Sequence, residues 1–193
     1  MQLEICANSF QSAMNAQKAG AHRIELCSEL SIGGITPSYE LLMKVMKDLH
    51  IPVHVLIRPR GGNFNYSKEE FEMMKENILI CKELGCKGIV SGVLHTDNRI
   101  DINRTQELMT LSKPLSFTFH RAFDEVAEPM IAIYELMSMG VDRLLTSGQK
   151  NTALEGIDLI VELQEIAKNE LIVMPGSGIN DLNCKTFKRN IGI

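Results

Sequence analysis

Three stretches of the chain align without gaps and decide the fold that we predict. They are Gly20-Ala-His-Arg-Ile-Glu-Leu-Cys27, Gly85-Cys-Lys-Gly-Ile-Val-Ser-Gly92 and Gly140-Val-Asp-Arg-Leu-Leu-Thr-Ser147. Each begins with a glycine of the kind that ends a helix and continues into a short run typical of a strand. Successive stretches are separated by about two strand-helix units. A unit that recurs along the whole chain favours a rotationally symmetric parallel barrel over an open sheet.

Seven short strand-like runs alternate with segments of helical periodicity. The predicted strands are residues 3–6, 23–27, 53–58, 88–92, 115–120, 143–147 and 171–174. The strand spacing places an eighth strand just beyond Ile193. We therefore expect an α/β fold, a (β/α)8 TIM barrel with seven visible strands and the eighth missing or truncated. Residues 1–193 would form one domain whose C-terminal closure is incomplete.

Several residues predict where the helices begin. Thr36-Pro37 is typical of a helix cap followed by a first-turn proline. Ser67/Glu70 and Thr152/Glu155 have the spacing of capping boxes. We also expect the segment after the seventh strand to begin a helix at Asn180.

Composition limits the classes of function. The chain of 193 residues is 45% hydrophobic and 23% charged, with a formal net charge of −4. The absence of a basic excess argues against a nucleic-acid-binding module. Because no run of 18 apolar residues occurs, we expect no membrane span and a cytoplasmic protein. Five cysteines, an odd number, indicate free thiols in a reducing compartment.

Alternation along the strands predicts an unusually polar barrel interior, because every second side chain faces inward. The predicted interior set is Glu4, Cys6, Arg23, Glu25, Cys27, His54, Leu56, Arg58, Ser116, Thr118, His120 and Arg143. One explanation is mutual neutralisation of the acidic and basic side chains. The other is a functional site at the carboxyl ends of the strands, where barrel enzymes carry their active sites.

Three loops suggest anion binding. Arg58 and Arg60 could clamp a carboxylate or phosphate, although Arg58 could instead be the counter-ion of Glu4 or Glu25. Glycine-rich turns let backbone N–H groups approach an anion, but they are also common simply because a turn is tight. Two such turns supply the remaining candidate anion-binding residues, which are Ser147, Gly148, Gly176, Ser177 and Gly178.

Two side-chain pairs suggest further chemistry. Glu25 and His120 could act as a general acid and base if the protein is an enzyme. Asp124 could orient His120 or pair with Arg121.

Two cysteines suggest a metal site. Cys6 and Cys27 end neighbouring strands, and two soft thiolates can suffice for Cu(I), although free cysteines are also common core residues. The other cysteines, Cys81, Cys86 and Cys184, and the eleven methionines are interpreted as packing residues.

The motifs together resemble the CutC copper-homeostasis family, from residue 3 to about residue 182. The matching segments are Glu25-Leu-Cys-Ser28, Gly33-Gly-Ile-Thr-Pro-Ser38, Pro52-Val-His-Val-Leu-Ile-Arg-Pro-Arg-Gly-Gly62, Thr118-Phe-His-Arg-Ala-Phe-Asp124, Leu145-Thr-Ser-Gly148, Ala153-Leu-Glu-Gly156 and Met174-Pro-Gly-Ser-Gly178. One departure is that the family's eighth strand, with a phrase like E-F-H-x-S-A, would follow Ile193.

The resemblance implies a TIM barrel, a cytoplasmic location and a homo-oligomer, commonly a dimer or tetramer. It implies copper, as Cu(I), bound at Cys6 and Cys27, and it brings no established reaction. We therefore expect a copper-homeostasis protein that binds Cu(I) at the barrel mouth. The alternatives are an enzyme acting on a small anionic metabolite, held by the arginine and glycine loops, and a scaffold that acts through oligomer surfaces.

Overall fold

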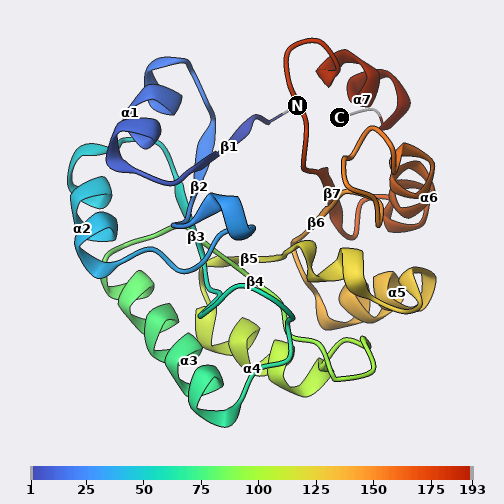
Figure 1. Ribbon diagram of the computed structural model, residues 1–193, viewed down its shortest axis with the longest axis horizontal. Helices are drawn as coiled ribbons and strands as arrows, with labels where there is room; N and C mark the ends of the chain where they lie inside the picture. Colours follow the sequence, from blue (N-terminus) through green and yellow to red (C-terminus); the bar gives the residue numbers. More distant parts are fainter. Residues whose placement is uncertain (1, 192–193) are drawn as a thin grey trace. The chain divides into compact units, whose positions relative to one another are not determined.

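The computed structural model describes residues 2–191, in which seven strands alternate with helices (Figure 1). The strands are β1 (Glu4–Ala7), β2 (Arg23–Leu26), β3 (Val53–Leu56), β4 (Gly88–Ser91), β5 (Ser116–Phe119), β6 (Arg143–Thr146) and β7 (Ile172–Pro175). The α-helices are α1 (Phe10–Lys18), α2 (Tyr39–Asp48), α3 (Lys68–Glu83), α4 (Ile102–Ser112), α5 (Pro129–Met139), α6 (Ile157–Ala167) and α7 (Cys184–Ile191). Two 3-10 helices, η1 (Leu30–Ile32) and η2 (Arg121–Glu125), follow β2 and β5.

The sheet has the strand order β1-β2-β3-β4-β5-β6-β7. Pairing is parallel from β1 to β4 and from β5 to β7. Strand order that follows sequence order is the topology that repeated βα units produce. The residues group into two compact units, each described by itself below. The N-terminal unit holds Gln2–Ser91 and Glu107–Phe117, and the C-terminal unit holds Gly92–Gln106 and the chain from Thr118 onward. The single domain expected from the sequence stays a prediction.

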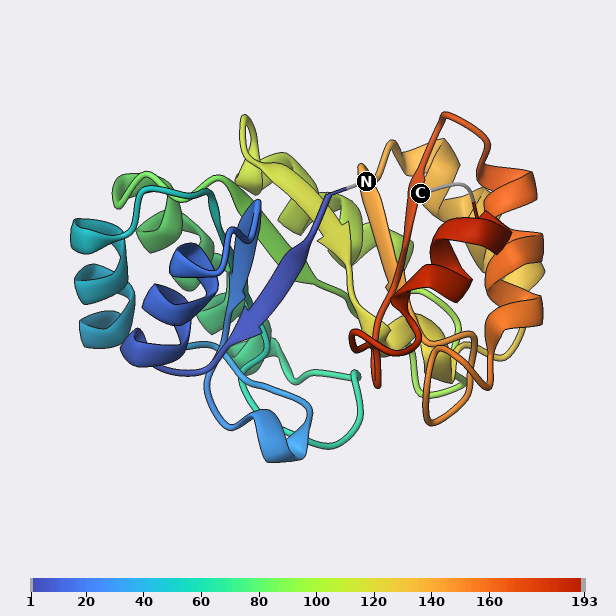
Figure 2. The same ribbon diagram turned by 90° about the horizontal axis from the view of Figure 1, so that it is seen from above.

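In the N-terminal unit, helices α1, α2 and α3 lie on one side of strands β1 to β4 (Figure 1). The loops that carry η1 and residues 57–66 extend from the end of the strands to which the arrows point (Figure 2). The strand side chains under the helices are apolar and buried, as Ile24, Val53 and Val55 show. This confirms the predicted alternation, because burial of these side chains stabilises the helix layer on the sheet.

Helix ends follow the sequence closely. Gly20, Gly85 and Gly140 stand at the ends of α1, α3 and α5 with φ of +85°, +80° and +78°. Only glycine adopts this left-handed conformation without a steric cost, so it ends helices efficiently. The capping box of Ser67 and Glu70 at the start of α3 is also confirmed.

The predicted start of α2 is wrong. The helix begins at Tyr39, and Ser38 rather than Thr36 caps it, with the Ser38 side chain accepting a hydrogen bond from the Leu41 N–H. The Thr36 hydroxyl instead accepts the backbone N–H of Arg58 at 2.8 Å. Thr36 therefore ties its loop to the chain after β3, a tertiary contact that local capping rules do not anticipate.

Two later helix starts also differ from the prediction. Thr152 and Glu155 form the reciprocal hydrogen bonds of a capping box, but they close a turn and α6 begins after Gly156. The helix expected at Asn180 begins at Cys184, because the Asn180 side chain accepts backbone N–H groups of a preceding turn. Among the residues that the structure describes, no helix has both the length and the apolar character needed to cross a bilayer.

Candidate functional site

Cys6, Cys27 and Glu25 lie together at the ends of β1 and β2. The sheet register places Cys6 opposite Glu25, and the Cys27 N–H donates to the Ala7 carbonyl at 3.0 Å. Cys27 is only 1% exposed, whereas Cys6 is exposed. The structure therefore brings together the two sulfur residues predicted as metal ligands, with the buried side chain of Glu25 on the second of the two strands.

Glu25 is an acid whose environment favours its protonated form. Burial, followed by the negative charge of Glu4, raises the pKa of Glu25 to about 8, against an opposing effect of Arg23. Arg23 donates its Nε–H to Glu4, so the predicted neutralisation is confirmed for Glu4. Glu25 Oε2 has no hydrogen-bond partner within the described part of the chain. Protonation removes most of the cost of burying this group.

Both thiols are also held in their protonated forms. The negative charge of Glu25 is the largest cause that raises the pKa of Cys6, and the charges of Cys27 and Glu4 add to it. Burial, followed by Glu25, raises the pKa of Cys27 to about 12. Because metals bind thiolates, any metal must displace these protons.

The ligand set at this pair limits the metals that fit. Among residues 2–191, no group of three or more His, Cys, Asp and Glu side chains is arranged to hold a metal ion. Structural zinc needs four such ligands, whereas two thiolates can bind Cu(I). The pair therefore fits a soft monovalent ion and does not fit a tetrahedral zinc site.

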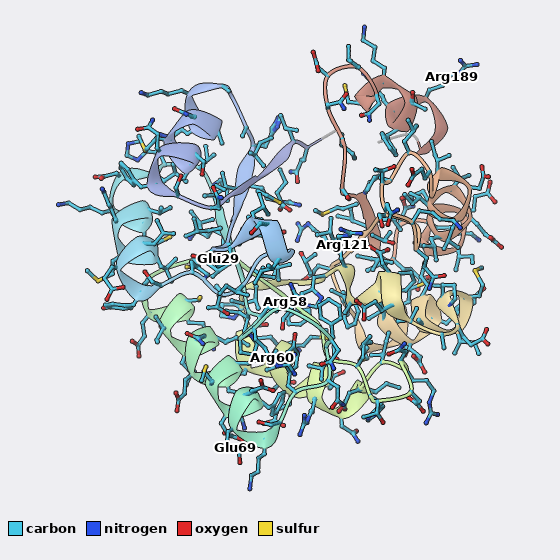
Figure 3. All side chains as sticks on the ribbon, in the orientation of Figure 1. Glu29, Arg58, Arg60, Glu69, Arg121 and Arg189 are labelled. Atoms are coloured by element: carbon cyan, nitrogen blue, oxygen red, sulfur yellow. The ribbon has the colours of Figure 1, made fainter. Side chains whose placement is uncertain are left out.

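Arg58 organises the loop after β3 (Figure 3). Its guanidinium group donates to three backbone carbonyl oxygens, those of Ile32 at 3.1 Å, Gly34 at 2.9 Å and Gly62 at 2.8 Å. The group also lies 4.7 Å from the centre of the Phe64 ring, and Arg58 is 6% exposed. The interpretation of Arg58 as a counter-ion of Glu4 or Glu25 is wrong, because its hydrogen bonds hold loop carbonyls.

Arg60 has a similar role in the same loop. It pairs with Glu70 at 2.7 Å and donates to the carbonyl oxygens of Gly61, Asn63 and Asn65. These bonds tie the loop to the first turn of α3. The anion-binding role of Arg58 and Arg60 stays a prediction, and an incoming anion would compete with partners within the chain.

In the C-terminal unit, the loop after β6 holds the carboxylate of Asp124, a residue of η2 in the same chain. The carboxylate accepts the Thr146 hydroxyl at 2.5 Å, the Ser147 N–H at 3.0 Å and hydroxyl at 2.9 Å, and the Gln149 N–H at 3.2 Å. Arg121 completes the set with its Nε 2.7 Å from Asp124. Convergent backbone and hydroxyl donors are the arrangement that binds phosphates and carboxylates. The predicted Asp124–Arg121 pair is thus confirmed, within a larger network.

The two glycine turns are closely packed. Gly148 has a φ of +68°, and a Cβ at this position would lie 2.1 Å from the Gly156 carbonyl oxygen. Gly176 leaves room for the Leu145 side chain, since a Cβ added at position 176 would lie 2.5 Å from Leu145 Cδ1. Close packing explains why glycine stands at both positions, while their anion-binding role stays a prediction.

Ser177 lies in the turn after β7 with a φ of +79°. Its hydroxyl donates to the Asn151 carbonyl at 2.8 Å, and the Ala153 N–H donates to the Ser177 carbonyl at 3.0 Å. Both bonds tie this turn to the loop that precedes α6. Gly178 follows with a φ of +72° and accepts hydrogen bonds from the Asn183 and Asn180 side chains. The role of Ser177 and Gly178 in anion binding likewise stays a prediction.

His120 is a buried residue that caps η2. Its Nδ1 accepts the Ala122 N–H at 3.2 Å, so the ring packs with this nitrogen turned to the backbone. A Cβ at Gly92 would lie 2.8 Å from the same nitrogen, which shows how tightly the ring is enclosed. His120 belongs to the C-terminal unit and Glu25 to the N-terminal unit, so their joint acid-base role stays a prediction.

Sequence reasoning missed the partners of Asp124. Thr146 and Gln149 flank Ser147-Gly148, and the run Thr-Ser-Gly-Gln after a strand signals a turn rich in donors. The sequence did not indicate that the anion would come from the same chain.

Comparison with known protein sequences shows the family to which the chain belongs. A sequence profile of the CutC family matches residues 1–193. The chain belongs to the CutC family. A human protein named "Copper homeostasis protein cutC homolog" is 48% identical over 190 residues, covering 98% of this chain and 70% of its own length. A CutC family protein from Salmonella paratyphi A is 47% identical over 186 residues, covering 96% of this chain and 74% of its own.

A solved structure confirms the fold of this CutC family member. The crystal structure of a CutC copper homeostasis protein from Streptococcus agalactiae matches with a TM-score of 0.93 and 35% identity. The match covers 100% of this chain and 96% of that one. The predicted fold class, an α/β fold of the TIM-barrel type, is therefore confirmed.

Proposed function

We propose that this CutC family member acts in copper homeostasis by binding Cu(I) with the thiolates of Cys6 and Cys27. The observation that carries the proposal is the register of β1 and β2, which pairs Cys6 with Glu25, and the charge of Glu25 raises the pKa of both the Cys6 and the Cys27 thiol. Soft sulfur ligands select Cu(I) over harder ions. The names of the human and Streptococcus agalactiae relatives support copper as the cargo.

The charge balance explains the role of Glu25 in this proposal. One Cu⁺ that replaces the protons of two thiols gives a complex of charge −1 and releases two protons. An ionised carboxylate beside that complex would repel it, whereas Glu25 with a pKa of about 8 is mostly protonated at pH 7. Copper affinity should therefore rise with pH as the thiols lose protons, and this rise should weaken near pH 8 as Glu25 ionises.

Competition with a chromophoric Cu(I) chelator under anaerobic conditions tests the proposal. The Cys6→Ser/Cys27→Ser double variant should lose one equivalent of tightly bound Cu(I). Cys184→Ser, which changes a half-buried cysteine of α7, should bind as the wild type does and serves as the matched control. Equal stoichiometry and affinity for wild type and double variant would refute the proposal.

A pH series separates the role of Glu25 from that of the thiols. Glu25→Gln keeps the side-chain shape but cannot ionise, so its copper affinity should continue to rise above pH 8. An affinity profile of Glu25→Gln that matches wild type between pH 6 and pH 9 would show that Glu25 does not control the site.

We also propose a cytoplasmic location and a homo-oligomer, a dimer or tetramer, as the family resemblance implies. The five described cysteines are all free thiols, as a reducing compartment requires. Light scattering coupled to gel filtration tests the oligomer, since a monomer at micromolar concentration would contradict it.

The enzyme alternative has less support. A small anionic metabolite would need donors at Arg58, Arg60 and the β6 loop. These groups already have partners within the chain.

A further inference from the structure

Three sulfur side chains meet in the N-terminal unit, away from the ends of β1 and β2. Cys81 lies in the last turns of α3, Cys86 in the connection from α3 to β4, and Met46 in α2. Helices α2 and α3 are neighbours on the outer side of the strands (Figure 1). No local sequence pattern groups these residues, because forty positions separate Met46 from Cys86.

The contacts among the three side chains are specific. The Cys86 N–H donates to the Cys81 carbonyl at 3.0 Å, which brings the two cysteines onto one turn at the helix end. The two thiols also interact electrostatically, because each shifts the pKa of the other. The Cys86 thiol also contacts Met46, with 3.8 Å between Sγ and Sδ. Cys86 thus contacts the Met46 thioether directly and lies beside Cys81 at the end of α3.

The separation of the Cys86 and Met46 sulfurs is compatible with a shared three-coordinate ion. Metal–thiolate bonds are about 2.3 Å long, so three sulfurs at 120° around one ion lie about 4.0 Å apart. The observed separation of 3.8 Å between Cys86 and Met46 is close to this value. A linear two-coordinate ion would need a separation of about 4.6 Å, twice the bond length.

The chemistry of the ligands selects the metal. Thiolates and thioethers are soft ligands that favour Cu(I). Zinc would need a fourth ligand, and no described group of three or more His, Cys, Asp and Glu side chains could hold a metal ion. A site made of two cysteines and one methionine therefore discriminates against zinc.

We propose that Cys81, Cys86 and Met46 form a second Cu(I) site, with three sulfur ligands contributed by α2 and by the end of α3. The inference extends the proposed copper function but uses different residues from the pair at Cys6 and Cys27. One Cu⁺ replaces the protons of both thiols, and the neutral thioether adds no charge, so the complex carries −1 and two protons leave.

The exposure of the three side chains indicates how an ion could reach the cluster. Cys81 and Cys86 are each 1% exposed, while Met46 is partly exposed. An ion would therefore enter at Met46 and move inward to the two thiols.

Copper stoichiometry in a variant without the first pair tests the inference. The Cys6→Ser/Cys27→Ser protein should still bind one equivalent of Cu(I), and adding Cys81→Ala/Cys86→Ala should remove it. Met46→Leu, which keeps the volume, should weaken this equivalent at least tenfold. Met43→Leu changes an exposed methionine of the same helix and should leave the affinity unchanged.

X-ray absorption of the Cys6→Ser/Cys27→Ser protein loaded with Cu(I) gives a readout that does not depend on the folding of the Cys81→Ala/Cys86→Ala variant. It should show three sulfur neighbours and no nitrogen or oxygen. Absence of copper from this protein, or a bound copper that Met46→Leu leaves unchanged, would overturn the second site.

The two proposals fail in distinguishable ways. Loss of all copper in Cys6→Ser/Cys27→Ser would reject the second site and keep the first. Loss of all copper in Cys81→Ala/Cys86→Ala, with full binding in Cys6→Ser/Cys27→Ser, would reject the first pair and keep the second.

Discussion

Asp124→Asn is the substitution that most directly probes the packing of the C-terminal unit. The asparagine has nearly the same shape, but it carries no charge and replaces one accepting oxygen by an NH2 donor. Oxygen Oδ2 of Asp124 accepts from Arg121 and from the Ser147 hydroxyl, and Oδ1 accepts from the Thr146 hydroxyl and from the Gln149 N–H. Whichever of the two oxygens is replaced, the new NH2 group will face donors of the network and cannot accept their hydrogen bonds.

The expected magnitude follows from these contacts. A hydrogen bond to a charged group contributes about 1.5–3 kcal/mol, and breaking a buried charge network by changing one partner costs about 3–5 kcal/mol. The Asp124 side chain is 9% exposed, so water can replace few of the lost partners. We expect the free energy of unfolding to fall by about 3 kcal/mol.

The exposed pair of Asp97 and Arg99 offers a matched control. Its Nε–Oδ2 distance is 2.8 Å, against 2.7 Å for Arg121 and Asp124, but the Asp97 side chain is 51% exposed. Asp97→Asn removes the same charge and should cost at most about 1 kcal/mol.

Urea unfolding followed by circular dichroism measures both variants. A lower midpoint at constant m-value for Asp124→Asn, with little change for Asp97→Asn, is the expected result. A loss below about 1 kcal/mol for Asp124→Asn, or equal losses in both, would refute the reasoning.

Three further predictions concern single residues. Glu25 has a folded pKa of about 8 against an ordinary value of 4.5, so the folded state binds more protons and stability should fall as pH rises from 4.5 to 8. The slope should approach at most about 1.4 kcal/mol per pH unit, and urea unfolding of Glu25→Gln should show no such slope. Arg58→Lys keeps the charge but loses the planar guanidinium group that holds three carbonyl oxygens. Thermal unfolding should therefore show a free energy of unfolding lower by about 2 kcal/mol. An unchanged unfolding midpoint would contradict this. Gly148→Ala should lower the free energy of unfolding, measured in urea, by more than about 2 kcal/mol, because the new Cβ would collide with the Gly156 carbonyl. Gly20→Ala is the matched control, since nothing lies within 4 Å of its Cβ, and it should lower the same quantity by only about 1 kcal/mol.

The arrangement of elements was readable in the sequence because it depends on local signals. These signals act over a few residues. They are the alternation along the strands, the left-handed glycines at 20, 85 and 140, and the capping box at Ser67. The predicted strands therefore agree with the observed ones to within two residues at each end. The start of α2 was predicted wrongly because Thr36 bonds to Arg58, a partner distant in the sequence.

The candidate sites show the same division. The strand pattern alone was enough to predict that Cys6, Cys27 and Glu25 lie on neighbouring strands, because alternation along a strand sets which side chains share a face. The loop carbonyls held by Arg58 and Arg60, and the position of Asp124 in the turn after β6, became known only from the folded chain. The same is true of the contact between Met46 and Cys86. These partners depend on which distant segments fold against each side chain, and no local pattern encodes that choice.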